Sequence, residues 1–153
     1  MATNTLLQKL YAADESGVGE DSVLVSNRRQ VETFIAAEDI TDGDIVCLDI
    51  SKSDDGEKML YIKKANTGAG ATTLTIGVAD EDIDQDKSGR VVIKGFKADA
   101  NVATGGATGD RIVGSSTGGR ATQYAASSTQ AILGYQLEAA SGNQADVYII
   151  KQF

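Results

Sequence analysis

Beyond residue 30, apolar and polar positions alternate over short runs, a pattern typical of β-strands. Strands are expected at 31–35, over about six residues after the Asp42-Gly43 turn, and at 58–63, 72–78 and 90–96. Between them lie a hairpin turn at 54–56, an acidic turn at 80–88 and a long loop at 98–109. No segment beyond residue 13 has a strong helical period. The sequence therefore predicts an all-β fold, a small β-barrel or β-sandwich.

One stretch of this pattern occurs twice. Residues 76–96 align without a gap with residues 133–153. The aligned pairs include Gly77 with Gly134, Val92 with Ile149, and Phe96 with Phe153. A Gly-Asp turn precedes each copy, at Gly43-Asp44 and at Gly109-Asp110. We interpret the domain, residues 31–153, as two diverged β-units at about 43–96 and 109–153.

Residues 1–30 have a different pattern and are interpreted as an extended, partly helical N-terminal arm. Four apolar residues fall on one side of a short helix: Leu6, Leu7, Leu10 and Tyr11. A polar, acidic linker follows at residues 14–21. A helix of two turns is not stable alone, so it packs either on its own domain or on a partner chain.

Arg28 and Arg29 form the only pair of adjacent arginines in the chain. In a chain with many carboxylates, such a pair either donates to an internal salt bridge or contacts a partner.

Charge and composition narrow the function classes. The net charge is −8 and the pI is about 4.4, which argues against nucleic-acid binding because that depends on Lys and Arg. Cys47, the single cysteine, lies in an apolar run and is expected to be a buried strand residue rather than a reactive thiol. No run is apolar enough for a signal peptide or a membrane span. We therefore expect no membrane partner, and synthesis and folding of the whole chain in a cytoplasm.

The residue types that carry most catalytic chemistry are missing or poorly placed. The chain contains no histidine, which removes Ser-His-Asp and Cys-His systems and imidazole metal sites. Asp82, Asp84 and Asp86 have the spacing that begins a calcium loop, but Lys87 and Ile93 stand where the loop needs Gly and an acid. This run is expected to be a solvated acidic turn, with weak cation binding as the alternative. We expect no enzyme activity and no cofactor.

The order of the turn and strand motifs resembles small bacteriophage capsid decoration (cement) proteins, over about residues 30–153. The motifs are Phe34-Ile35-Ala36-Ala37, Gly43-Asp44-Ile45-Val46, Ile76-Gly77-Val78-Ala79, residues 91–95, Gly109-Asp110 and Leu133-Gly134. The resemblance implies a β-rich domain, commonly a homotrimer, on the outside of an icosahedral shell. It also implies that the protein clamps neighbouring major capsid proteins, in a virion assembled in the bacterial host.

Members of that family often lack so long an N-terminal extension, so the arm is interpreted from its own residues. The candidate capsid contacts are Leu6, Leu7, Leu10, Tyr11, Arg28 and Arg29. Two alternatives stay open: a tail, fibre or host-adhesion β-domain, and, in a different class, an enzyme or carrier accessory domain.

Overall fold

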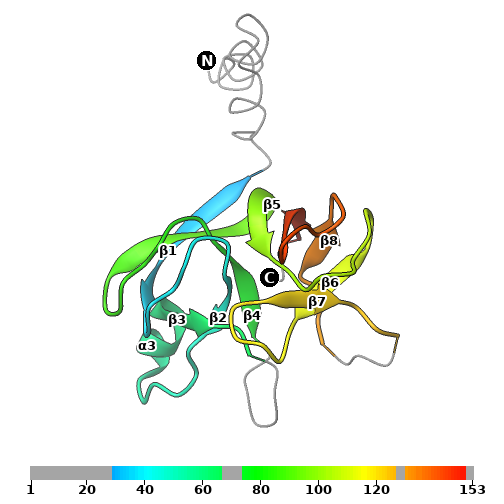
Figure 1. The fold of residues 1–153 in the computed structure, drawn as a ribbon. Helices are drawn as coiled ribbons and strands as arrows, with labels where there is room; N and C mark the ends of the chain where they lie inside the picture. Colours follow the sequence, from blue (N-terminus) through cyan, green and yellow to red (C-terminus); the bar gives the residue numbers. More distant parts are fainter. Residues whose placement is uncertain (1–28, 67–73, 127–129, 151–153) are drawn as a thin grey trace, which may run out of the picture.

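The computed structural model describes residues 29–66, 74–126 and 130–150, and Figure 1 shows how they are arranged. The predicted arm helix, with Leu6, Leu7, Leu10 and Tyr11, lies outside the described residues, and so does Arg28. Within the described residues, no helix is long and apolar enough to cross a membrane.

The regular secondary structure of the described residues is almost entirely β-strand. The elements are β1 (Gln30–Ala36), β2 (Ile45–Leu48), α3 (Asp55–Leu60), β3 (Tyr61–Lys64), β4 (Thr75–Ala79), β5 (Ser88–Asn101), β6 (Arg111–Gly114), β7 (Ala121–Gln123), β8 (Gly134–Gln136) and β9 (Gln144–Ile149). The strands form one sheet in the order β1-β3-β2-β4-β5-β9-β8-β6-β7. β1 also pairs with β5, which closes β1, β3, β2, β4 and β5 into a five-stranded barrel. The predicted all-β fold with a small barrel is confirmed.

The barrel interior is filled by the inward-facing side chains of all five strands. On β1 these are Phe34 and Ala36, whereas Val31 faces solvent. The interior cluster is Phe34, Ala36, Ile40, Val46, Ile62, Ile76, Ala79, Ile83, Val91 and Ile93. Because β-branched side chains pack well on a pleated surface, a core with few aromatic residues still fills the barrel.

β5 is long enough to serve two β-units. Its pairing with β1 extends to Lys94, and its pairing with β9 starts at Gly95. We call β5 beyond Gly95 together with β9, β8, β6 and β7 the second unit. Just after β5, Val102 forms a parallel bridge with Ala121 of β7, which closes the second unit.

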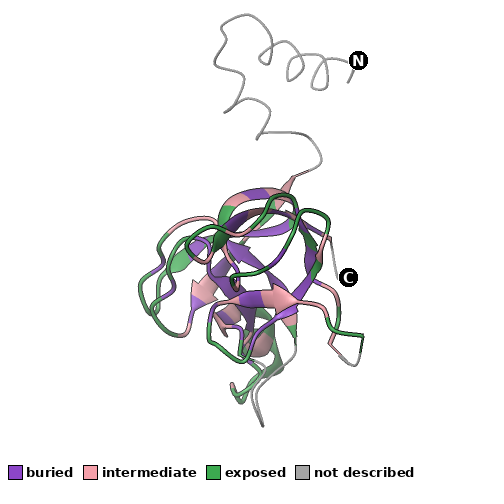
Figure 2. Cartoon of the chain, turned by 45° about the vertical axis from the view of Figure 1, so that its right-hand side comes forward, coloured by how far each residue is buried: buried purple, intermediate pink, exposed green. Residues whose placement is uncertain are grey.

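A second cluster of buried residues fills this unit and joins it to the barrel. Its members are Ile45, Cys47, Ala65, Val78, Ala100, Val102, Ile112, Ala121, Leu133, Ala145, Val147 and Ile149. Ile45, Cys47 and Val78 of the barrel strands, with Ala65 just after β3, belong to this cluster. One packed core therefore includes the junction between the barrel and the second unit. Burial continues across both units, as Figure 2 shows.

Strand pairing follows the same scheme in both units. β2 pairs with β3 and β4, and β6 pairs with β7 and β8. Gly77 lies opposite Val46, and Gly134 lies opposite Ile112. The parallel contact of β1 with β3 corresponds to the bridge between the end of β5 and β7. The duplication itself stays a prediction, and this shared pairing supports it.

The pairing also corrects one part of the predicted alignment. Val92 lies opposite Val78, and the residue in the corresponding place of the second unit is Tyr148, opposite Tyr135. The sequence alignment matched Val92 with Ile149 instead. The turn before the last strand is therefore one residue shorter in the second unit, which an ungapped alignment does not detect.

The Gly-Asp turns have the same geometry in both units. The Thr41 N–H donates to the Asp44 carboxylate at 3.0 Å, and the Ala107 N–H donates to the Asp110 carboxylate at 2.8 Å. Gly43 and its counterpart Gly109 both have positive φ, 84° and 90°. Such a backbone conformation favours glycine.

Residues 54–63 differ from the prediction of a hairpin turn and a strand at 58–63. Asp54 caps the helix α3 by accepting from the N–H groups of Gly56 and Glu57, and β3 begins only at Tyr61. α3 buries none of its residues, so it has no apolar periodicity to detect. β5 likewise runs to Asn101, so the predicted loop at 98–109 is shorter than expected.

Candidate functional site

The hairpin between β6 and β7 docks against the barrel. The Ile45 N–H donates to the Gly119 carbonyl at 2.8 Å, and the Gly119 N–H donates to the Ala65 carbonyl at 3.0 Å. A Cβ on Gly119 would lie 2.6 Å from Oδ1 of Asp44, and its φ is +74°. Only glycine fits this close approach.

Polar side chains at the same junction are paired. Asp44 is buried; Nδ2 of Asn101 donates to its Oδ1 at 3.2 Å, and Nζ of Lys64 lies 3.4 Å from its Oδ2. Nε of Arg120 donates to Oδ1 of Asn101 at 3.1 Å. Because a buried carboxylate needs partners, these bonds fix the second unit against the barrel.

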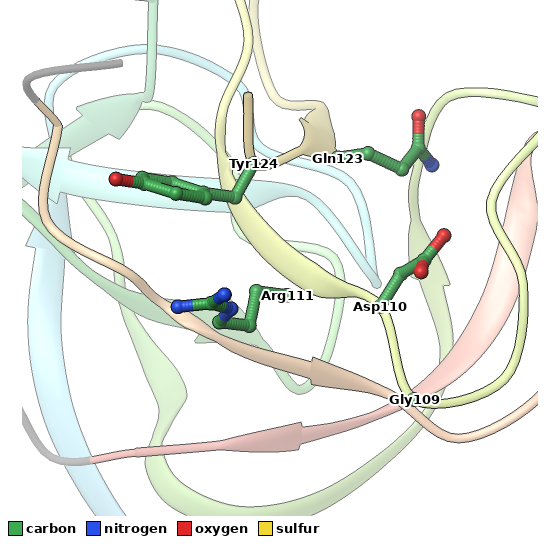
Figure 3. A pocket seen from close by; sticks show the side chains of 5 residues that line it. All are labelled: Gly109, Asp110, Arg111, Gln123 and Tyr124. Carbon is green, nitrogen blue, oxygen red and sulfur yellow. The ribbon is translucent and has the colours of Figure 1, made fainter. Parts of the chain in front are cut away.

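On the second unit, a hollow of about 360 Å³ opens to solvent, and Figure 3 shows the side chains that line it. Its lining residues are Gly109, Asp110, Arg111, Gln123 and Tyr124. The Arg111 guanidinium lies over the Tyr124 ring, 5.2 Å from the ring centroid. We call this the Arg111–Tyr124 hollow. An exposed cation stacked on a half-buried ring suits a protein surface that carries apolar and acidic groups.

Sequence reasoning missed this hollow and several exposed apolar side chains. They include Met59 (63% exposed) and Leu60 (52%) at the end of α3, and Tyr135 (41%) and Leu137 (42%) at and just beyond β8. Apolar residues in predicted strands are expected to be buried, so the sequence carried no signal that these are not.

Of the candidate capsid contacts, the described residues include Arg29. Its guanidinium forms an ion pair with Asp80, directly after β4. Nζ of Lys97 lies 2.8 Å from Asp42 and 4.0 Å from Asp80, so one cluster of charges holds the start of β1. Arg29 thus makes the internal salt bridge that was one of its two alternatives. Its role as a capsid contact stays a prediction, as do those of Arg28 and the arm residues.

Cys47 lies buried in β2, as predicted. Burial raises the pKa of its thiol to about 11. Since the thiolate is the nucleophilic form, Cys47 is unreactive at neutral pH.

Hydrogen bonds from neighbouring residues hold the acidic turn after β4 in place. The Asp42 N–H donates to Oδ1 of Asp82 at 2.8 Å, and hydrogen bonds from the Arg90 N–H and side chain hold the pKa of Glu81 below its usual range. The side chains of Asp82, Asp84 and Asp86 are exposed. In the described part of the chain, no group of three or more His, Cys, Asp or Glu side chains is placed to hold a metal ion.

Comparison with known proteins finds a matching family and a similar solved structure. A family model described as phage cement protein matches residues 25–151. The crystal structure of the head fiber gp8.5 N base in bacteriophage phi29 has a similar fold, with a TM-score of 0.56 and 17% sequence identity, over 80% of this chain and 94% of that one. No curated protein sequence matches the chain.

Proposed function

Because the chain belongs to the phage cement protein family, and is therefore a structural protein of a phage virion, we propose that it binds the outside of the assembled icosahedral capsid as a trimer and clamps neighbouring major capsid proteins. The observation that carries this proposal is the family match, which includes both β-units and the charge cluster at the start of β1.

The mechanism is mass action. A protein that binds the assembled shell but not its separated subunits stabilises the assembled state by an amount that grows with its concentration and affinity. The net charge of −8 on the whole chain favours attraction to a surface of complementary charge.

The N-terminal arm supplies the contacts with neighbouring subunits. Leu6, Leu7, Leu10 and Tyr11 anchor it through apolar packing, with Arg28 as a polar contact. Arg29 positions the arm, since its ion pair with Asp80 fixes the point where the chain enters β1. Three weak arm contacts joined in one trimer gain affinity through effective concentration.

Co-sedimentation with assembled shells tests the proposal. Deletion of residues 1–20 should weaken shell binding at least tenfold while the far-UV circular dichroism and melting temperature of the body stay unchanged, because the described contacts of the barrel begin at Arg29. A Leu137→Ala variant, which changes an exposed apolar residue on the body, is the matched control. Full binding by the truncated protein would contradict the role of the arm, and no binding by the intact chain would contradict the function.

A second candidate is a component of a head fibre. It is favoured by the fold that the chain shares with the phi29 head fiber base. Electron microscopy of particles carrying the protein separates the two. Density distributed over the shell surface supports the cement role, and density only at the base of projecting fibres supports the alternative.

A further inference from the structure

The shared strand pairing gives a residue-by-residue correspondence between the barrel and the second unit. Ile45 lies opposite Val78, and Arg111 lies opposite Tyr135. The Ala65 N–H donates to the Ile45 carbonyl at 2.8 Å, and the Tyr124 N–H donates to the Arg111 carbonyl at 2.7 Å. Arg111 and Tyr124 therefore hold the places of Ile45 and Ala65.

By this correspondence, the Arg111–Tyr124 hollow is the second unit's equivalent of the site that binds the β6–β7 hairpin on the barrel. On the barrel, Ile45 and Ala65 bind Gly119 of the β6–β7 hairpin. On the second unit, the same position is open to solvent. One docking site thus occurs twice in the chain, filled in the barrel and open in the second unit.

The segment that would fill the open site follows from the same correspondence. Leu48 pairs with Ile62 in the barrel, and Gly114 pairs with Ala121 in the second unit, so Ile62 and Ala121 are equivalent. Leu60 lies two residues before Ile62, and Gly119 lies two residues before Ala121. Leu60 is therefore the barrel residue equivalent to Gly119. Leu60 and Met59 end α3, and both are largely exposed. The barrel thus presents a projecting segment where the second unit presents its docked hairpin.

We propose that the end of α3 in a second copy of this chain, with Met59 and Leu60, docks in the Arg111–Tyr124 hollow of the first. Gly119 uses its backbone in the barrel site, whereas Leu60 brings a side chain, and the volume of the hollow leaves room for it. The Leu60 side chain packs on the ring of Tyr124.

Charge is complementary across this contact. Arg111 is exposed and its guanidinium lies over Tyr124. The first turn of α3 carries the exposed acids Asp55 and Glu57; Asp55 pairs with Lys58 of its own helix at 2.7 Å, so Glu57 is the acid that faces Arg111. Opposite charges at the rim of an interface steer association and fix its register.

The contact is head-to-tail, because each copy presents the α3 end on its barrel and the hollow on its second unit. Such heterologous interfaces generate closed rings where the rotation closes and filaments where it does not. This inference rests on the proposed function only for the number of copies, three. It adds to that function the contact by which one chain of the trimer binds the next.

Sedimentation velocity of the full chain tests the contact in solution. The wild type should self-associate, and Leu60→Asp or Arg111→Glu should shift it to monomer, with at least a tenfold rise in the dissociation constant. Val31→Asp, at an exposed residue near the start of β1 that neither lines the hollow nor belongs to α3, should leave association unchanged. A wild type that stays monomeric at its highest soluble concentration would overturn the proposal, and so would unchanged association of both variants.

Mixing the variants tests the head-to-tail arrangement. Arg111→Glu keeps its α3 end and Leu60→Asp keeps its hollow, so an equal mixture should form a heterodimer and no larger species. A mixture that remains monomeric while each protein keeps its wild-type circular dichroism would exclude this geometry.

Disulfide trapping covers the case in which a variant fails to fold. Leu60→Cys and Tyr124→Cys proteins, mixed under oxidising conditions, should cross-link one to the other, because Gly119 and Ala65 are in backbone contact at the equivalent site. Cys47 is buried and should not react. A cross-link of Leu60→Cys with Val31→Cys at equal yield would overturn the assignment. A protein that self-associates in this way but does not bind shells would keep this inference and refute the proposed function.

Discussion

Gly43 and Gly109 hold equivalent positions in the two Gly-Asp turns, yet one is covered and the other is open. A Cβ on Gly43 would lie 2.5 Å from the carbonyl oxygen of Asp99, whereas a Cβ on Gly109 would meet no atom within 4 Å. The two turns share their backbone conformation and their hydrogen bonds. The difference between them is therefore the packing of the second unit on the barrel.

Alanine at the two positions should measure that packing. Gly109→Ala adds only the cost of a left-handed backbone, about 1–2 kcal/mol. Gly43→Ala adds the same cost and a clash with the Asp99 carbonyl, for a total of about 3–4 kcal/mol. Urea unfolding at low protein concentration gives both values. Equal losses would show that Gly43 is not packed as described.

The strand glycines Gly77 and Gly134 should be intolerant of any side chain. A Cβ on either would lie within about 2.2 Å of a carbonyl oxygen of the neighbouring strand, that of Val92 or Tyr148. We expect Gly77→Ala and Gly134→Ala each to cost about 2–4 kcal/mol in unfolding free energy. Gly118→Ala, whose Cβ would lie 3.9 Å from Lys64, is the control and should change stability by less than about 0.5 kcal/mol. A similar small change at Gly134 would argue against the pairing of β8 with β9.

Cys47 should make the fold less stable at alkaline pH. Burial raises its pKa from 9.0 to about 11, so between these values the unfolded thiol has lost its proton while the folded thiol keeps it. The unfolded state then binds fewer protons, and the free energy of unfolding falls as pH rises through this window. Ellman's reagent should react with Cys47 only after unfolding.

A Cys47→Val variant isolates the thiol contribution. Asp49 raises the pKa of Lys63 by accepting its hydrogen bond, so deprotonation of Lys63 also lowers stability at alkaline pH. The variant keeps the Lys63 contribution and should lose only that of the thiol. Identical alkaline slopes for both proteins would show that Cys47 is accessible to solvent.

Asp49 should make the fold sensitive to acid. Burial opposes its charged form, but hydrogen bonds from Lys63 at 2.8 Å and from Ser51 outweigh burial and hold its pKa below the usual 3.8. A lowered pKa contributes stability above the unfolded value, and this is lost as pH falls through the folded pKa. Asp49→Asn should therefore cost about 1 kcal/mol at pH 7 and much less at low pH. A loss that does not depend on pH would assign Asp49 a packing role alone.

Local pattern predicted the features that depend on neighbouring residues. Alternation placed β1, an apolar run placed Cys47 in a buried strand, and the repeated glycine matched Gly77 with Gly134. α3 escaped because it is short and buries nothing, so Asp54 was interpreted as a turn residue instead of a cap. The Arg111–Tyr124 hollow escaped because it exists only where β6 and the end of β7 come together, and because Arg111 replaces the apolar Ile45 of the first unit.

β5 has a mechanical consequence for the whole body. Its first half completes the barrel and its second half completes the other unit, so each unit borrows part of one continuous strand. If either half of β5 unfolded alone, the unit that it completes would lose a strand and would be left with an unpaired sheet edge. The two units should therefore unfold together in one cooperative transition, and a force that pulls on one of them is carried through β5 into the other.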